Sequence, residues 1–279
     1  MASHAIQRRG GDWRPGAAAA GSTVTRASIV GRVRLSIVVP TYNERTRLGE
    51  LVEAVFAVFA AHAIDGELVI VDDGSPDGTG ALADDLATRH RIRVVHRPGK
   101  LGLGTAVIDG FAVASGEILG VMDADLSHPP EALPRLLAAL QGAGPSGEGA
   151  DLAIGSRYVP GGGVRNWPAH RQLMSRLACL LARPITPARD STSGYFLVRR
   201  DAVEGVLIAA GGFKICLELL VRGRVGSVVE VPYTFSDRAA GESKMSWREA
   251  TGYLWQLRDL MRFRRGHPAA QRYVRFDPS

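Results

Sequence analysis

Cysteine is nearly absent from this chain, because only Cys179 and Cys216 occur among its 279 residues. Both lie in apolar stretches, and neither belongs to a CxxC pair of the kind found in metal or redox sites. Free cysteines in apolar surroundings are usually buried, and they persist in reducing compartments. We therefore expect two buried free thiols in a cytoplasmic protein rather than a disulfide.

Long apolar runs are also missing. No stretch of 18 consecutive apolar residues occurs, and the best candidate, residues 51–64, is interrupted by Glu53 and His62. A membrane-spanning helix needs about 20 predominantly apolar residues, so the sequence predicts none. Residues 1–33 lack the apolar core of a secretion signal and are rich in Ala, Gly, Ser and Arg. This composition predicts a disordered basic tail.

Acidic residues are outnumbered, with 28 Asp and Glu against 34 Lys and Arg, which gives a net charge of +6. A basic balance favours anionic partners such as nucleic acid, an acidic lipid surface or a phosphorylated substrate. Part of the excess lies in the amino-terminal tail, so the charge alone does not choose among them. The content of 46% hydrophobic and 22% charged residues is ordinary for a globular protein.

From residue 34 onward, short β-branched runs alternate with helical patterns, which predicts βαβ units around a mostly parallel sheet. In the first half, the predicted strands are 35–39, 68–71, 92–96, 118–122 and 152–155, and the predicted helices are 45–63, 80–90, 104–114 and 131–140. The second half is mixed, with helices at 171–182, 215–222 and 247–263 and strands at 195–199 and 228–235.

Two pairs of carboxylates follow predicted strands. Asp123 and Asp125 come just after the apolar run 117–121, and Asp72-Asp73 closes the apolar run 67–71. The core cannot neutralise both Asp123 and Asp125, so we expect this pair to need a cation, and the adjacent Asp72 and Asp73 would repel each other unless something binds them. Open α/β sheets bind ligands at the carboxyl ends of their strands, and Mg²⁺ takes carboxylates together with phosphate oxygens. The pattern predicts a metal-assisted nucleotide site, although signalling receiver domains also carry acidic strand ends.

Residues beside these carboxylates have less specific interpretations. Tyr42 offers an aromatic face for a nucleotide base, whereas Glu44 could simply cap the following helix. His128 stands beside Pro129-Pro130 without the spacing of a metal ligand, and we interpret it as a loop residue.

Several segments together resemble one enzyme family. They are PTYNE at 40–44, VDDGSPDGT at 71–79, DADLSHP at 123–129, GSRY at 155–158, DSTSGY at 190–195 and DRAAGESK at 237–244. This set is similar to the dolichol-phosphate (polyprenol-phosphate) mannose synthases, inverting glycosyltransferases of family 2 with the GT-A fold. The resemblance extends over residues 35–263, and it favours the subtype that consists of the catalytic domain alone.

The resemblance implies an α/β fold of the GT-A type, a Rossmann-like nucleotide-diphospho-sugar transferase with a mostly parallel sheet flanked by helices. It implies a single domain over 34–265, with a donor-binding half at 34–140 and a mixed acceptor half at 150–265. A polar tail would follow at 266–279.

The resemblance also implies the site residues. Asp123 and Asp125 would ligate Mg²⁺ or Mn²⁺, and these two residues with Arg238 and Lys244 would form the catalytic set. The positions that match donor-binding residues for GDP-mannose are Pro40, Tyr42, Glu44, Val71, Asp73, Asp123, Ala124, Asp125, Arg157, Arg238 and Lys244. Some relatives have Gln as a further metal ligand where this chain has Ser127, so the contribution of Ser127 is left open.

The chemistry of the residues agrees with this family. In sugar transfer from a nucleoside diphosphate, negative charge develops on the departing diphosphate, and a divalent ion with cationic side chains stabilises it. A phosphate acceptor is already an anionic nucleophile near neutral pH and needs no strong base. Arg238 and Lys244 would clamp such a phosphate.

Two basic amphipathic segments suit a lipid acceptor. Residues 170–183 and 247–265 place leucines at helical spacing beside arginines, and such helices can lie on anionic bilayers. Ordinary core packing with a solvated face, or binding to an integral membrane partner, would also fit the pattern.

The sequence thus predicts transfer of mannose from GDP-mannose to polyprenyl phosphate with inversion. We expect a cytoplasmic protein, peripheral at the cytoplasmic face of the membrane, with no nucleic-acid partner. Two alternatives stay open. One is glucose transfer from UDP-glucose, and the other is a non-catalytic, membrane-associated subunit that binds nucleotide.

Overall fold

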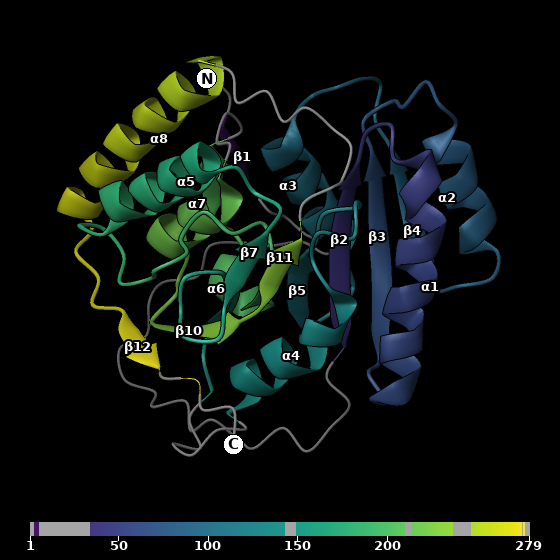
Figure 1. Cartoon of the computed structure of the whole chain (residues 1–279), viewed down its shortest axis with the longest axis horizontal. Helices are drawn as coiled ribbons and strands as arrows, with labels where there is room; N and C mark the ends of the chain where they lie inside the picture. Colours follow the sequence, from purple (N-terminus) through teal and green to yellow (C-terminus); the bar gives the residue numbers. More distant parts are fainter. Residues whose placement is uncertain are drawn as a thin grey trace, which may run out of the picture.

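An eight-stranded sheet crosses the molecule in the order β12-β10-β6-β8-β5-β2-β3-β4 (Figure 1). The computed structural model describes residues 3–5, 34–142, 149–209, 214–236, 247–274 and 276. The strands of this sheet are β2 (Leu35–Thr41), β3 (Gly66–Asp72), β4 (Ile92–His96), β5 (Ile118–Val121), β6 (Leu152–Ser156), β8 (Phe196–Arg199), β10 (Ser227–Pro232) and β12 (Arg272–Val274). The predicted α/β fold with a mostly parallel sheet is confirmed.

β8 is the exception to the parallel order, because it runs antiparallel to both of its neighbours, β5 and β6. Val121 at the end of β5 pairs with Phe196 at the start of β8, and Ile118 pairs with Arg199. Residues that precede β8 therefore reach the same edge of the sheet as residues that follow β5 and β6. We call this edge, where the parallel strands end, the carboxyl edge.

Helices cover both faces of the sheet. One face packs against α1 (Arg45–Ala61), α2 (Thr79–Ala87) and α4 (Leu133–Gln141), which follows the 3₁₀ turn η1 (Pro130–Ala132). The other face packs against α3 (Leu103–Val113), α6 (Arg200–Val203) and α7 (Ile215–Arg222). The sheet is thus buried on both sides, as the apolar strands predict.

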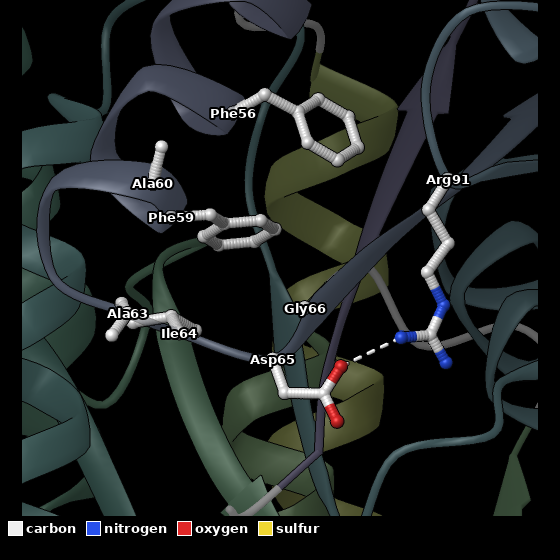
Figure 2. Close-up of a pocket in the computed structure, with 8 residues that line it drawn as sticks. All are labelled: Phe56, Phe59, Ala60, Ala63, Ile64, Asp65, Gly66 and Arg91. Carbon is white, nitrogen blue, oxygen red and sulfur yellow. Dashed lines mark hydrogen bonds and ion pairs between the residues drawn. The ribbon is translucent and has the colours of Figure 1, made fainter.

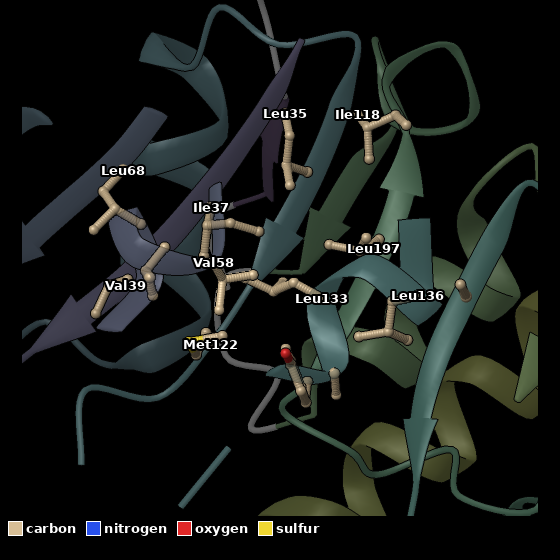
Figure 3. Packing of buried hydrophobic residues seen from close by; sticks show 14 of the residues in the cluster. Leu35, Ile37, Val39, Val58, Leu68, Ile118, Met122, Leu133, Leu136 and Leu197 are labelled. Carbon is tan, nitrogen blue, oxygen red and sulfur yellow. The ribbon is translucent and has the colours of Figure 1, made fainter. Parts of the chain in front are cut away.

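Successive side chains of β2 point to opposite faces of the sheet, which explains why the molecule has a core on each face. Ile37 and Val39 belong to the cluster that includes α1 and α4, whereas Val38 belongs to the cluster with α3. Figure 3 shows part of the first cluster, with Ile37 and Val39 near Met122. On the opposite face, a Cβ on Gly110 would lie 2.5 Å from a methyl carbon of Val38, so the absence of a side chain lets α3 approach the sheet closely.

The second half of the chain adds a further layer. The helices α5 (Ala169–Ala182) and α8 (Trp247–Gly266) lie beside α7 (Figure 1). A small apolar cluster joins them, and the Tyr253 hydroxyl donates to the Ala178 carbonyl oxygen at 2.6 Å. Within the described ranges, no helix combines the length and apolar character needed to cross a bilayer. Cys179 and Cys216 are buried free thiols, as predicted.

Short strands differ most from the prediction. The expected strand at 228–235 is divided at Tyr233 into β10 and β11 (Thr234–Ser236), and β11 pairs with β7 (Gly163–Arg165). These short strands are held by backbone pairing with distant segments, which an apolar pattern does not reveal.

Both predicted tails contain a strand. Within the expected disordered tail 1–33, β1 (Ser3–Ala5) pairs with β9 (Leu207–Ala209), whereas residues 6–33 lie outside the described residues. Within the expected polar tail 266–279, β12 extends the main sheet beside β10, and Val274 is buried. The division of 34–265 into donor and acceptor halves stays a prediction.

Candidate active site

The segment after β5 turns back on itself at the carboxyl edge. We call residues 123–128 the acidic loop. Leu126 has a φ of 63°, a left-handed conformation that few leucines adopt, and it reverses the chain here. The Ser127 N–H donates to Asp125 Oδ1 at 3.0 Å. The loop therefore fixes the direction of the Asp125 carboxylate and returns the chain toward Asp123.

His128 ends this loop and is buried against Asp123. The Asp123 N–H donates to His128 Nδ1 at 3.1 Å, and His128 Nε2 lies 3.7 Å from Asp123 Oδ2. Burial lowers the pKa of His128 below its ordinary value, and the Asp123 and Asp125 carboxylates only partly oppose this shift. The interpretation of His128 as a loop residue was correct about its position, but it missed the contact with Asp123.

The two carboxylates fit a hard divalent cation. The Asp123 side chain is 38% exposed, so one of the charges at this edge stays accessible to solvent. Across the described part of the chain, no group of three or more His, Cys, Asp or Glu could hold a metal, so a cation here would complete its shell with water and substrate oxygens. Mg²⁺ is commonly bound in this way. The Ser127 hydroxyl is buried without a hydrogen-bond partner among the described residues.

The other acidic pair, which we expect to repel unless something binds it, has partners within the protein. Asp72 accepts hydrogen bonds from the Ser75 N–H at 3.0 Å and from the Thr41 hydroxyl at 3.2 Å. Asp73 pairs with the buried Arg97 and accepts the Gly102 N–H at 3.1 Å. The Arg97 guanidinium therefore offsets the charge of Asp73, whereas the partners of Asp72 are neutral donors.

The predicted donor-binding residues of the first half meet at the carboxyl edge. Strand register places Pro40 opposite Val71 and Thr41 opposite Asp72, and β5 lies on the other side of β2. Tyr42 is exposed, and the Lys100 ammonium lies 4.3 Å from the centre of its ring. Glu44 occupies the N-cap position of α1 without a side-chain capping bond. Ala124 is buried within the acidic loop.

Arg157 follows β6 at the same edge, where Asp190 holds it. Its Nε donates to Asp190 Oδ2 at 2.8 Å and its Nη2 donates to Asp190 Oδ1 at 2.6 Å. Both side chains are buried. Burial disfavours the charge on Arg157, but Asp190 outweighs this effect and raises the pKa of the guanidinium. The role of Arg157 as a donor contact stays a prediction.

A basic pocket of about 620 Å³ opens beside Arg157. The backbone after β6 and one side of α5 line it, and its cationic residues are Arg157, Arg176, Arg183 and Arg189. Leu180 and Val159 add apolar surface. The pocket therefore combines positive charge with an apolar wall.

A second pocket, of about 420 Å³, lies at the opposite edge of the sheet (Figure 2). It adjoins Gly66, the first residue of β3, and Phe56 and Phe59 of α1. The Asp65 carboxylate and Arg91 form an ion pair of 2.7 Å at its rim. This pocket contains none of the predicted site residues.

Arg238 and Lys244 lie outside the described residues, as does the whole DRAAGESK segment at 237–244. Their roles stay predictions.

Two residues that matter here, Arg97 and Asp190, carried no predicted role. Arg97 follows β4 beside the end of β3, and it neutralises Asp73. Asp190 begins the DSTSGY segment and holds Arg157. The position of Arg97 at a neighbouring strand end was a usable signal, whereas the pairing of Arg157 with Asp190, 33 residues away, was not visible locally.

Comparison with known proteins agrees with this arrangement. The family model described as glycosyl transferase family 2 matches residues 36–207. A dolichol-phosphate mannosyltransferase of Pyrococcus furiosus is 43% identical over 235 residues, covering 83% of this chain and 64% of the relative. A polyprenol monophosphomannose synthase of Mycolicibacterium smegmatis is 43% identical over 245 residues, covering 83% of this chain and 88% of the relative. The chain thus spans less than two thirds of the archaeal relative.

Solved structures share the fold. The Pyrobaculum calidifontis mannosyltransferase PcManGT, in complex with GDP-Man and Mn²⁺, has a TM-score of 0.58 at 20% identity and covers 84% of this chain and 65% of its own. The Mycobacterium tuberculosis glucosyl-3-phosphoglycerate synthase, in complex with Mn²⁺ and UDP-glucose, has a TM-score of 0.59 at 21% identity. It covers 85% of this chain and 81% of its own. The expected GT-A fold is confirmed.

Proposed function

We propose that this chain transfers mannose from GDP-mannose to polyprenyl phosphate. The chain belongs to glycosyl transferase family 2 and, within this family, to the dolichol-phosphate and polyprenol-phosphate mannose synthases. The transfer would be a single displacement with inversion. The observation that carries the proposal is the acidic loop, which turns Asp123 and Asp125 toward one edge of the sheet together with the ends of β2 and β3.

The donor would occupy the carboxyl edge. Asp123 and Asp125 would hold Mg²⁺ or Mn²⁺, which would offset the charge that develops on the leaving diphosphate. The complex of PcManGT with GDP-Man and Mn²⁺ supports this choice of donor and metal. Tyr42 follows β2 and Asp73 follows the paired β3, where its N–H donates to the Thr41 carbonyl oxygen at 3.0 Å, and both residues would contact the nucleoside part of the donor.

The acceptor phosphate would bind on the side of Arg157. The basic pocket beside this residue supports an acceptor that carries negative charge on an apolar chain, because arginines and Leu180 line the same space. A phosphate monoester is largely ionised near neutral pH, so it can attack without a general base. Arg238 and Lys244 would add cationic contacts to the phosphate groups.

A lipid acceptor requires contact with a membrane. On α5, Leu173, Leu177 and Leu180 are exposed on the side away from α7, and Arg176 lies among them. Exposed leucines beside arginines on one helix are typical of surfaces that bind anionic bilayers. We propose that α5 contacts the cytoplasmic face of the membrane and brings the basic pocket to the lipid headgroups.

The test is a transfer assay on the full chain with radiolabelled GDP-mannose, polyprenyl phosphate and Mg²⁺ or Mn²⁺. We expect mannose in the lipid extract, and loss of this label when the metal is chelated. Unlabelled UDP-glucose in excess should not compete. If no lipid is labelled although GDP binds, the chain is a nucleotide-binding subunit rather than a transferase. Strong competition by UDP-glucose would indicate that the transferred sugar is glucose rather than mannose.

A further inference from the structure

We infer that His128 is a positioning residue, which fixes the direction of the Asp123 carboxylate so that Asp123 and Asp125 face one cation. This inference rests on the proposed function, because it concerns the metal-binding geometry of the same site. His128 would contact neither substrate nor metal and would act only through Asp123.

The hydrogen bonds define how the ring acts. Because the Asp123 N–H donates to Nδ1, that nitrogen carries no proton, and a neutral ring must carry its proton on Nε2. Nε2 lies 3.7 Å from Asp123 Oδ2, too far for a good hydrogen bond but close enough for attraction between the N–H and the carboxylate. The ring thus contacts the backbone and the side chain of one residue, which restricts how Asp123 can rotate.

Aromatic neighbours hold the ring itself in place. The imidazole stacks on Tyr195, with ring centres 5.0 Å apart and planes 14° apart. Phe235 and Tyr233 approach it edge-on, at 5.5 Å and 5.8 Å. The Tyr195 hydroxyl donates to the Pro129 carbonyl oxygen at 3.0 Å and so ties the residue that follows the acidic loop to the residue that precedes β8. The second half of the chain therefore fixes a loop that belongs to the first half.

Space near Asp123 is restricted on one side. A Cβ on Gly194 would lie 3.3 Å from His128 Cε1 and 3.5 Å from both Asp123 carboxylate oxygens. Glycine at 194 spares the His128 ring this close approach, whereas the Asp123 oxygens would meet a Cβ only at ordinary contact distance. Residues that orient a metal ligand commonly change metal affinity by about 10–100-fold when they are replaced.

His128 is not itself a candidate ligand. Its Nδ1 accepts a hydrogen bond, its side chain is buried, and the described residues contain no cluster of three metal-binding side chains. A purely structural role would predict that any shape-preserving replacement keeps metal affinity. A positioning role predicts that affinity depends on the nitrogen at Nδ1.

The experiment compares His128→Phe, which keeps the ring shape and loses both nitrogens, with His128→Asn, whose amide oxygen can replace Nδ1 as acceptor. His90→Phe is the matched control, because His90 also stacks on an aromatic ring, Phe56, at 4.6 Å, but lies far from the acidic loop. Binding of Mn²⁺ to the full chain, alone and with GDP, is measured from the electron paramagnetic resonance signal of free Mn²⁺. Thermal unfolding of each variant is recorded in parallel.

We expect His128→Phe to stay folded, with a lowered unfolding temperature because the Asp123 N–H loses its acceptor, and to bind Mn²⁺ about tenfold or more weakly. His128→Asn should recover most of the affinity, and His90→Phe should match wild type. Wild-type Mn²⁺ affinity in a folded His128→Phe protein overturns the inference. If that variant does not fold, His128→Gln, whose amide reaches toward Nε2, replaces it, and equal affinities of the Asn and Gln variants overturn the inference.

The same titration separates this inference from the proposed function. If wild type binds no Mn²⁺, or if Asp125→Ala does not weaken binding, the metal role of the acidic loop is wrong. If wild type and Asp125→Ala differ while His128 variants do not, only the positioning role is wrong.

Discussion

Asp73 and Asp123 both follow strands at the carboxyl edge, but their surroundings differ. The Asp73 side chain is 8% exposed and pairs with Arg97, whereas the Asp123 side chain is 38% exposed and faces His128. A carboxylate that the protein already neutralises shapes the loop around it, as Asp73 does by accepting the Gly102 N–H. A carboxylate open to solvent can take part in binding a cation.

Asp125→Asn should remove the metal role with little structural change. The amide oxygen can still accept the Ser127 N–H that Asp125 Oδ1 accepts, but the negative charge is lost. We expect the transfer rate to fall by about 100-fold or more, in the range typical of lost electrostatic stabilisation. Initial rates with radiolabelled donor measure the effect, and circular dichroism checks the fold. Asp84→Asn, at an exposed carboxylate on α2, is the control. Wild-type rates for Asp125→Asn would contradict the metal role.

Asp190→Asn should destabilise the protein. The substitution leaves the buried Arg157 guanidinium without its carboxylate, and breaking a buried ion pair in this way costs about 3–5 kcal/mol. Urea unfolding measures the free energy. Glu50→Gln removes the exposed partner of Arg47 and should cost less than about 1 kcal/mol. Equal effects of the two substitutions would show that the Arg157–Asp190 pair does not stabilise the fold.

At the scale of elements, α5 has two unlike sides. Ala182 packs in the cluster with α7 and α8, whereas Leu173 and Leu177 are 68% and 51% exposed. Apolar side chains on the open side contribute nothing to the core. The unfavourable free energy of exposing them to water must therefore be offset by other interactions.

Replacing Leu173 and Leu177 together by serine should weaken membrane binding. Vesicle flotation with phosphatidylglycerol and phosphatidylcholine mixtures should show about a tenfold loss or more, because inserting each leucine is favourable by about 1.5–3 kcal/mol. The thermal midpoint should not fall, since both side chains are exposed. Leu207→Ser, at an exposed leucine on β9, is the control. Undiminished flotation would exclude α5 as the binding surface.

β3 depends on a buried carboxylate at its start. Glu67 accepts hydrogen bonds from the Ser36 hydroxyl of β2 at 2.6 Å and from the Ser115 N–H at 2.6 Å, and it pairs with Arg93 of β4. Burial alone would raise the pKa of Glu67, but these hydrogen bonds together hold it below its ordinary value of 4.5. The ionised form is therefore favoured in the folded protein.

Glu67→Gln should reveal the contribution of ionised Glu67 through the pH dependence of the unfolding free energy. A depressed pKa contributes stability that is complete above the unfolded value near 4.5 and is lost as pH falls through the folded value. The stability difference between wild type and Glu67→Gln should thus be largest near neutral pH and shrink below pH 4.5. Urea unfolding across this range measures it, with exposed Glu117→Gln as the control. A difference that does not change with pH would contradict the role of ionised Glu67.

At the scale of the whole molecule, the carboxyl-terminal segment closes one side of the sheet. β12 pairs with β10, and the Tyr273 hydroxyl donates to the buried Glu230 Oε2 at 2.9 Å. Glu230 in turn accepts the Arg189 and Asp190 N–H groups, each at 2.8 Å. The last strand thus supports the segment that holds Arg157.

Ending the chain at residue 270 should lower the thermal midpoint markedly, because it removes the β12 pairing and the buried Val274 side chain. Tyr273→Phe is the matched substitution, and it should cost about 1–3 kcal/mol by leaving the buried Glu230 with one donor fewer. Calorimetry of the three proteins measures both effects. An unchanged midpoint after truncation would mean that β12 does not stabilise the sheet.

The sequence predicted the first half of the fold well, because β2, β3 and β5 are short apolar runs bounded by clear turns. It also placed Asp123 and Asp125 correctly after a strand. It did not predict the direction of β8, and it missed β7 and β12, because these depend on pairing between distant segments. The contact of His128 with Asp123 depends on the left-handed turn at Leu126, which leucine rarely adopts and which no local pattern signals.

The reversed direction of β8 has a consequence for changing this protein by design. Its two ends open onto opposite rims, with Gly194 and Tyr195 on the rim of the acidic loop and Arg199 on the far one. An insertion before Phe196 would grow over the carboxylates and change which substrates can enter. The far end is closed to such a change, because Arg200, the first residue of α6, is buried there and donates to the Gly116 carbonyl oxygen at 2.7 Å.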